Sequence, residues 1–171
     1  MANRFYLNDL QFSRTENCVF ISHHKNDKEI AKKIAEYIYA SGVDIYFDEF
    51  DNSINKDNPD SVVNAIKRGI NRSSHMLCIL SKDALRSKWM PWEIGYGYDR
   101  LLVAGVIIKG LSYSVLPEYL QIVPIIQGTN TLNAYISDLA NRDESSLIRE
   151  AKLISASKLY HPLNKLLNRK L

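Results

Sequence analysis

Short apolar runs alternate with amphipathic segments along residues 18–140, and this alternation restricts the folds open to the chain. Apolar runs of strand length predict five buried strands, at residues 18–22, 43–47, 75–80, 106–108 and 123–126. The stretches between them place apolar residues at helical spacing. Alternation of this kind predicts an α/β fold with a mostly parallel sheet and helices on both of its faces.

Local signals mark where the helices begin and end. Isoleucines recur every fourth residue over 30–38, with Asn26 and Glu29 as an expected capping box and Gly42 as an expected stop. Asn58-Pro59 predicts the cap and first turn of a second helix. Further helices are expected from about Ser87 or Met90 to Leu102, over 117–120 and over 132–139.

The two ends of the chain depart from this pattern. We therefore expect an N-terminal extension over 1–17, a core domain over 18–140 and a C-terminal helical extension over 141–171. Apolar spacing in the last part predicts one helix around 147–154 and a short one beginning near Pro162. The first residues contain no long apolar stretch, so no signal peptide is expected, and no run approaches the ~18 residues of a membrane span.

Charge and cysteine content narrow the class of function. A net charge of +3 without a concentrated basic patch argues against a nucleic-acid or membrane partner. Cys18 and Cys78 both lie in apolar runs, so we expect buried thiols in a reducing, cytoplasmic compartment. Two cysteines cannot form a disulfide framework, and no cluster with metal-ligand spacing is present, so no metal is expected.

Residues 81–97 are the most informative stretch for chemistry. In parallel sheets, ligands bind beyond the carboxyl ends of the strands, which directs attention to the loops after Ile21, Phe47 and Leu80. Trp89 and Glu93 stand four residues apart near the start of the helix after the third strand. A structural interpretation is also open, in which the tryptophan is a core side chain and the glutamate interacts favourably with the positive end of the helix dipole.

Two glycines in the same helix weaken that structural interpretation. Gly95 and Gly97 each lower helix propensity by about 1 kcal/mol relative to alanine. Such residues are expected where another group must approach the helix closely.

Several segments, taken in order, resemble the motif set of Toll/interleukin-1 receptor (TIR) domains over residues 18–140. They are Val19-Phe-Ile-Ser22, Val43-Asp-Ile-Tyr-Phe-Asp48, Met76-Leu-Cys-Ile-Leu-Ser81 and Ser87-Lys-Trp89 followed by Glu93. The resemblance implies a flavodoxin-like parallel five-stranded sheet. The stretch 117–126 is similar to the bacterial NAD-consuming branch found in Thoeris anti-phage systems.

The resemblance implies an enzyme that cleaves the nicotinamide–ribose bond of NAD+, with NAD+ as substrate and no cofactor. Glu93 corresponds to the family's catalytic glutamate, which stabilises positive charge developing on the ribose. Expected substrate-binding residues are Trp89, Ser22, His23, His24, Phe47 and Asp48. Solvated or hydrogen-bonded loop positions for the histidines, and a core position for Phe47, remain alternatives.

The same resemblance suggests partners and products. The products would be nicotinamide and either ADP-ribose or a cyclic isomer, the latter as a signal for a downstream effector. Self-association is expected through the Asp48–Asn58 loop, although this acidic loop lacks the proline-glycine element common in receptor TIR domains. Two other hypotheses remain: a TIR scaffold for protein–protein assembly without turnover, and a nucleoside deoxyribosyltransferase-like enzyme that leaves NAD+ intact.

Overall fold

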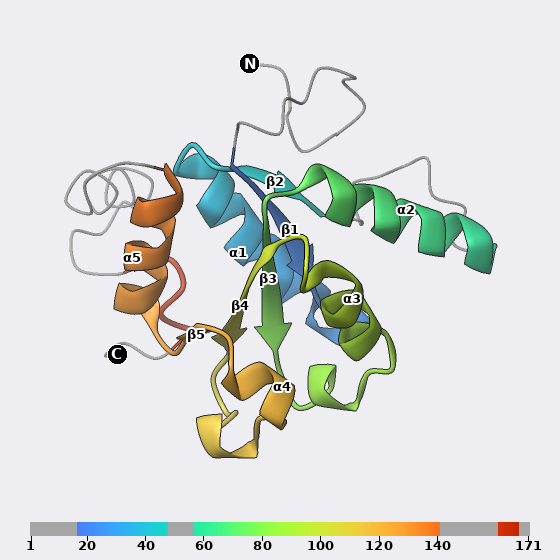
Figure 1. Ribbon diagram of the computed structural model, residues 1–171. Helices are drawn as coiled ribbons and strands as arrows, with labels where there is room; N and C mark the ends of the chain where they lie inside the picture. The colour runs from blue at the N-terminus through green and yellow to red at the C-terminus, as the bar shows by residue number, and fades with distance from the viewer. Residues whose placement is uncertain (1–16, 48–56, 141–160, 168–171) are drawn as a thin grey trace.

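The chain folds around a five-stranded sheet covered by helices (Figure 1). The computed structural model describes residues 17–47, 57–140 and 161–167. The strands are β1 (Cys18–Ser22), β2 (Asp44–Tyr46), β3 (His75–Leu80), β4 (Leu102–Ile107) and β5 (Ile125–Ile126). All neighbouring pairs are parallel and the order is β2-β1-β3-β4-β5. This is the flavodoxin-like order, so the expected fold class is confirmed.

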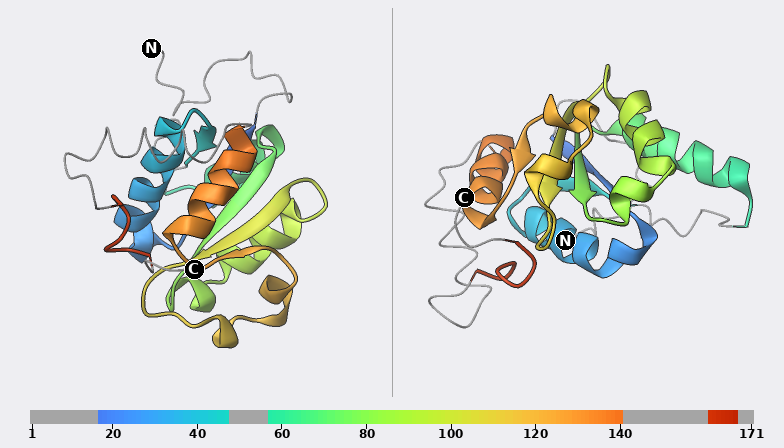
Figure 2. Two further views of the ribbon diagram at one scale, coloured as in Figure 1. Left: turned by 90° about the vertical axis from the view of Figure 1, so that its left-hand side faces the viewer. Right: turned by 90° about the horizontal axis from the view of Figure 1, so that it is seen from below.

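Helices cover both faces of the sheet, as the alternating pattern predicted (Figure 2). One face carries α1 (Lys28–Ala40) and α5 (Thr129–Ala140), and the other carries α2 (Pro59–Arg72), α3 (Trp89–Gly97) and α4 (Glu118–Gln121). Short 3-10 turns at Lys25–Asp27, Ala84–Arg86 and Tyr113–Val115 complete the described elements. Among the described residues, no helix is both long and apolar enough to cross a membrane.

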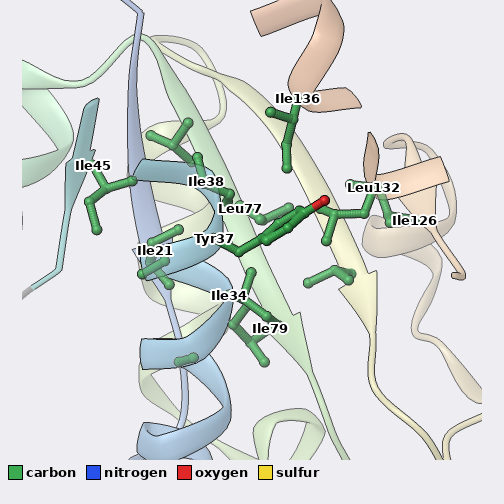
Figure 3. Packing of buried hydrophobic residues seen from close by; sticks show 14 of the residues in the cluster. Ile21, Ile34, Tyr37, Ile38, Ile45, Leu77, Ile79, Ile126, Leu132 and Ile136 are labelled. Carbon is green, nitrogen blue, oxygen red and sulfur yellow. The ribbon is translucent and has the colours of Figure 1, made fainter. Parts of the chain in front are cut away.

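The core on the α1 and α5 face consists of interlocking aliphatic side chains (Figure 3). Ile34 and Ile38 of α1 meet Leu77 and Ile79 of β3, and all four are fully buried. On the other face, Tyr46 packs over α2, where Gly69 has no side chain to obstruct it: a Cβ there would lie 2.4 Å from Cε1 of Tyr46. The Tyr46 hydroxyl donates to the carbonyl of Ala65 at 3.2 Å, which fixes α2 against β2.

The start of α2 and the end of α1 lie where the sequence predicted them. Asn58 accepts hydrogen bonds from the N–H groups of Asp60 at 3.0 Å and Ser61 at 3.4 Å, with Pro59 in the first turn. Gly42 adopts a φ of 87° after α1, so the expected stop is confirmed.

The expected capping box at Asn26 is wrong. A 3-10 turn precedes α1, and His24 caps that turn, because its Nδ1 accepts from the N–H of Asn26 at 3.2 Å. The N-cap residue of α1 itself is Asp27, which makes no side-chain capping bond. The Asn26 amide instead donates to Asp83 Oδ2 across the sheet edge at 2.9 Å.

The expected end of the third helix is also wrong. α3 ends at Gly97 and not at Leu102, because the N–H groups of Arg100 and Leu101 both bond to the Gly97 carbonyl and close a turn. Residues 102–107 then pair with β3 along its whole length, from His75↔Leu102 to Leu80↔Ile107. The apolar residues 101–103 continue the helical spacing, so the sequence pattern does not show that the helix ends at Gly97.

Residues 161–167 pack beside α1 and α5, with Leu163 and Leu167 buried in the same core. They form turns where a short helix was expected near Pro162. Partners outside the segment hold it: the backbone N–H of Lys109 donates to Leu166 O at 2.8 Å, and its ammonium donates to Asn164 O at 2.6 Å. The helix expected around 147–154 lies outside the described residues.

Candidate active site

The candidate site lies where β1 and β3 end side by side. In this strand order the connections leave β1 and β3 toward opposite faces, and the crevice between their carboxyl ends is the usual ligand position. Ser22 is the last residue of β1, Ser81 directly follows β3, and α3 begins eight residues later at Trp89. Sequence positions far apart in the chain therefore meet at one edge of the sheet.

Glu93 of α3 reaches this edge and meets Ser22. The Ser22 hydroxyl donates a hydrogen bond to Glu93 Oε2 with an oxygen–oxygen distance of 2.5 Å. The serine is 1% exposed and the glutamate 8% exposed. A buried carboxylate is stable only when hydrogen-bond donors compensate for the water it has lost. Glu93 is therefore a buried acid at the carboxyl ends of β1 and β3. It is not a solvent-exposed residue whose only interaction is with the helix dipole.

Cys78 lies beside this pair, because it stands opposite Ser22 in the register of β1 and β3. Burial raises the pKa of its thiol, and the nearby Glu93 carboxylate raises it further, while a hydrogen bond with Ser22 partly offsets both effects. Cys18 is also buried, and its pKa is raised to about 12, mainly by burial. Both cysteines are free and buried, so the expectation of two buried thiols is confirmed.

Two hydrogen bonds join the loops that follow β1 and β3. The Ser81 hydroxyl donates to Asp27 Oδ2 at 2.5 Å and accepts from the N–H of Ala84 at 2.9 Å. The Asn26 amide donates to Asp83 Oδ2. This clasp fixes the spacing of the two loops around the site. The strand-end rule directs attention to Ser81, whereas nothing in the local sequence distinguishes Asp27.

Trp89 is the first residue of α3 and lies at the surface. It is 47% exposed and meets Trp92 edge-to-face with ring centroids 5.7 Å apart. The Ser87 hydroxyl accepts from the N–H groups of Trp89 and Met90, which holds the start of the helix. The structural interpretation of Trp89 as a core side chain is therefore wrong. Its predicted contact with substrate stays a prediction.

The remaining expected substrate contacts fall into different environments. His23 is half-buried, with its ring 4.7 Å from that of Phe47. His24 turns its Nδ1 back to the backbone, which agrees with the hydrogen-bonded loop alternative. Phe47 is 1% exposed and belongs to the core, which agrees with the core alternative. Asp48 and most of the Asp48–Asn58 loop lie outside the described residues.

The two glycines of α3 have different surroundings. A Cβ at Gly97 would lie 2.7 Å from Cε of Met76, so the close approach expected there is made by β3 and not by a ligand. A Cβ at Gly95 would meet nothing within 4 Å. Gly95 lines an apolar cavity of about 360 Å³ between α3 and α4, together with Pro91, Tyr98, Tyr119 and Ile122 among others.

No metal site is evident in the part of the chain that the structure describes. Within those ranges, no group of three or more histidine, cysteine or acidic side chains is placed to bind an ion.

A flavodoxin-like sheet with a buried acid at its switch point is the arrangement of many ligand-binding α/β domains. The TIR domain family model matches residues 19–138, and the chain belongs to the TIR domain family. A solved TIR domain, from the Toll-related receptor TRR-2 of Hydra magnipapillata, shares this fold with a TM-score of 0.53 and 14% identity. That similarity covers 63% of this chain and 81% of the receptor domain.

Two curated relatives carry activities in their names. The 2' cyclic ADP-D-ribose synthase AbTIR of Acinetobacter baumannii is 30% identical over 90 residues, or 52% of this chain and 32% of the relative. The NAD(+) hydrolase TcpA of a Theionarchaea archaeon is 30% identical over 77 residues, or 44% of this chain and 22% of the relative. The matched stretch therefore spans a third or less of each relative.

Proposed function

We propose that this chain is an enzyme that cleaves the nicotinamide–ribose bond of NAD+ with Glu93 as its catalytic residue. The observation that carries the proposal is the buried Glu93 carboxylate at the carboxyl ends of β1 and β3, held by the Ser22 hydroxyl. The proposal gains support from the two relatives, which are named as an NAD(+) hydrolase and a cyclic ADP-ribose synthase.

A single carboxylate suits this reaction. The bond between C1′ of the ribose and the pyridinium nitrogen breaks, and its electron pair leaves with nicotinamide, which becomes neutral. Little acid catalysis is needed, whereas the ribose gains oxocarbenium character. The negative charge of Glu93 would stabilise that cation, and its oxygens can accept hydrogen bonds from ribose hydroxyls.

The second half of the reaction decides the product. If water attacks C1′ and then loses a proton, the product is ADP-ribose. If the site excludes water and an internal nucleophile of the same molecule attacks C1′, the product is a cyclic ADP-ribose isomer. We propose the cyclic product as a signal for a downstream effector. A cytoplasmic role in bacterial anti-phage defence is proposed from the Thoeris resemblance alone.

The test is incubation of the chain with NAD+, with chromatographic identification of every product. Wild-type protein is expected to release nicotinamide, and Glu93→Gln is expected to lower the rate by about 100-fold or more, because the charge facing the cation is lost. Glu36→Gln is the matched control, since it makes the same chemical change on the exposed face of α1. Unchanged turnover in Glu93→Gln would contradict the assigned role.

The same assay separates the other two hypotheses. A scaffold would leave NAD+ untouched at every protein concentration, while still forming assemblies. A nucleoside deoxyribosyltransferase-like enzyme would cleave added nucleosides and spare NAD+. Circular dichroism and thermal unfolding of each variant would show that any loss of rate is not a loss of fold.

A further inference from the structure

We infer that Ser22 is a positioning residue, whose hydroxyl fixes the Glu93 carboxylate in place and does not itself bind substrate. The inference rests on the proposed function, and it replaces the earlier expectation that Ser22 contacts NAD+. Three observations support it: the burial of the Ser22 side chain, its position on a central strand, and the contacts of its hydroxyl with Glu93 and Cys78.

Accessibility argues against a substrate contact. Ser22 is 1% exposed, so a ligand at this edge of the sheet would meet very little of the side chain. Its hydroxyl proton is already donated to Glu93 Oε2 over 2.5 Å. A hydrogen bond to a charged acceptor is about twice as strong as one between neutral groups, so a neutral ribose hydroxyl competes poorly for that proton.

The backbone around Ser22 is fixed on a central strand. β1 lies between β2 and β3, and Ser22 stands opposite Cys78 in the parallel register. The fully buried Cys78 contacts the same hydroxyl, so Ser22 sits between the thiol and the carboxylate. The clasp from Asp27 to Ser81 closes the loops beyond the strand ends. Ser22 is therefore a rigid donor that can define the direction of a flexible glutamate.

Such a donor has a specific kinetic effect. A glutamate has three side-chain torsions, and a hydrogen bond to one oxygen restricts the rotamers open to the carboxylate. A carboxylate held in one place stabilises the developing cation better than a mobile one, so removal of the hydroxyl is expected to lower kcat and to leave KM nearly unchanged.

The first arm of the test is kinetic. Ser22→Ala is expected to lower kcat by roughly 10- to 100-fold with KM within about two-fold of wild type, and Ser22→Thr, which retains a hydroxyl, is expected to recover most of the loss. In the Glu93→Gln background, Ser22→Ala is expected to have no further effect. A raised KM with unchanged kcat would show that the hydroxyl binds substrate. A kcat equal to or above that of wild type would equally overturn the inference.

The second arm does not depend on turnover. Urea unfolding of Ser22→Ala, Glu93→Ala and the double variant forms a cycle, and the three shifts in midpoint are expected to be non-additive because the two side chains are in direct contact. Additive shifts, with an active wild-type chain, would overturn the positioning role and leave the proposed function intact. An inactive wild-type chain would refute the proposed function and the positioning role of Ser22 with it, whereas non-additive shifts would still establish the contact.

Discussion

At the scale of single residues, Gly69 gives the clearest prediction about stability. Gly69→Ala would place a Cβ within 2.4–2.8 Å of three Tyr46 ring atoms. The ring cannot move freely, because its hydroxyl bonds to Ala65 O and its face stacks on Phe20 with centroids 5.5 Å apart. We expect the free energy of unfolding, measured in urea, to fall by about 1–3 kcal/mol through overpacking.

Gly95 provides the matched control in another helix. Gly95→Ala adds the same methyl group where nothing lies within 4 Å. Alanine is the better helix former by about 1 kcal/mol, so this variant is expected to be slightly more stable than wild type. Equal losses of stability in Gly69→Ala and Gly95→Ala would contradict the packing described for Tyr46.

The predictability of site residues depends on how far apart in sequence their partners lie. Glu93 could be singled out because the motif that resembles TIR domains, with its spacing from Trp89, is local in sequence. The role of Ser22 could not be read in the same way, because its partner is 71 positions away. The bond between Asp27 and Ser81 spans 54 positions, and no periodicity reports such a pair. Local patterns thus located the acid, and only the sheet order revealed what holds it.

At the scale of elements, the segment 161–167 is held through a histidine that must stay neutral. His161 Nδ1 accepts from the N–H of Leu163 at 3.1 Å, so Nε2 carries the proton and donates to Asn133 Oδ1 at 3.2 Å. The same amide oxygen accepts from the Tyr37 hydroxyl at 2.7 Å. Burial lowers the pKa of His161 to about 4, from an ordinary value of about 6.5.

Docking of residues 161–167 is expected to weaken as the pH falls. Between about pH 6.5 and 4 the released segment takes up a proton that the docked segment does not, so docking is strongest above pH 6.5 and weakens as the pH falls. We expect hydrogen exchange at the Lys109 amide, which bonds to Leu166 O, to accelerate over this range relative to amides in β3.

His161→Gln is the control for this effect, because glutamine can still donate a hydrogen bond but does not titrate between pH 4 and 7. Its Lys109 amide is expected to show a much smaller dependence on pH. The same acceleration in wild type and variant would assign the effect to other groups.

Element boundaries were predictable where local chemistry sets them. Asn58-Pro59 began α2 as expected, since the capping oxygen of Asn58 and the N–H donors that it accepts from lie within three residues. The end of α3 was not predictable, because residues 102–107 form a strand only through their pairing with β3. The turns at 161–167 likewise depend on Lys109, more than 50 positions away, whose hydrogen bonds take the place of helical ones.

At the scale of the whole molecule, the self-association that the family resemblance implies through the Asp48–Asn58 loop predicts a rate that depends on protein concentration. If a second copy completes the site, turnover per chain is expected to rise as the protein is concentrated. The check is nicotinamide release from dilute to crowded conditions, with assembly followed by light scattering. Strict proportionality between rate and protein concentration would contradict a site shared between copies.

A substitution in the loop tests the same self-association while Glu93 is left unchanged. Asp57→Lys reverses one charge at the described end of the loop. It is expected to shift the concentration of half-maximal turnover by several-fold, while the rate at saturation is largely retained. A variant that loses its rate equally at every concentration would instead indicate damage to the site.

The adjacency of β1 and β3 also bears on how this chain is made. Glu93 meets Ser22 only after both strands have paired and α3 has docked, and the residues involved extend to Gly97. A nascent chain therefore cannot bring Glu93 against Ser22 until residues up to Gly97 have emerged from the ribosome. Under the proposed function, a product truncated before residue 93 would lack the catalytic carboxylate and would leave NAD+ intact.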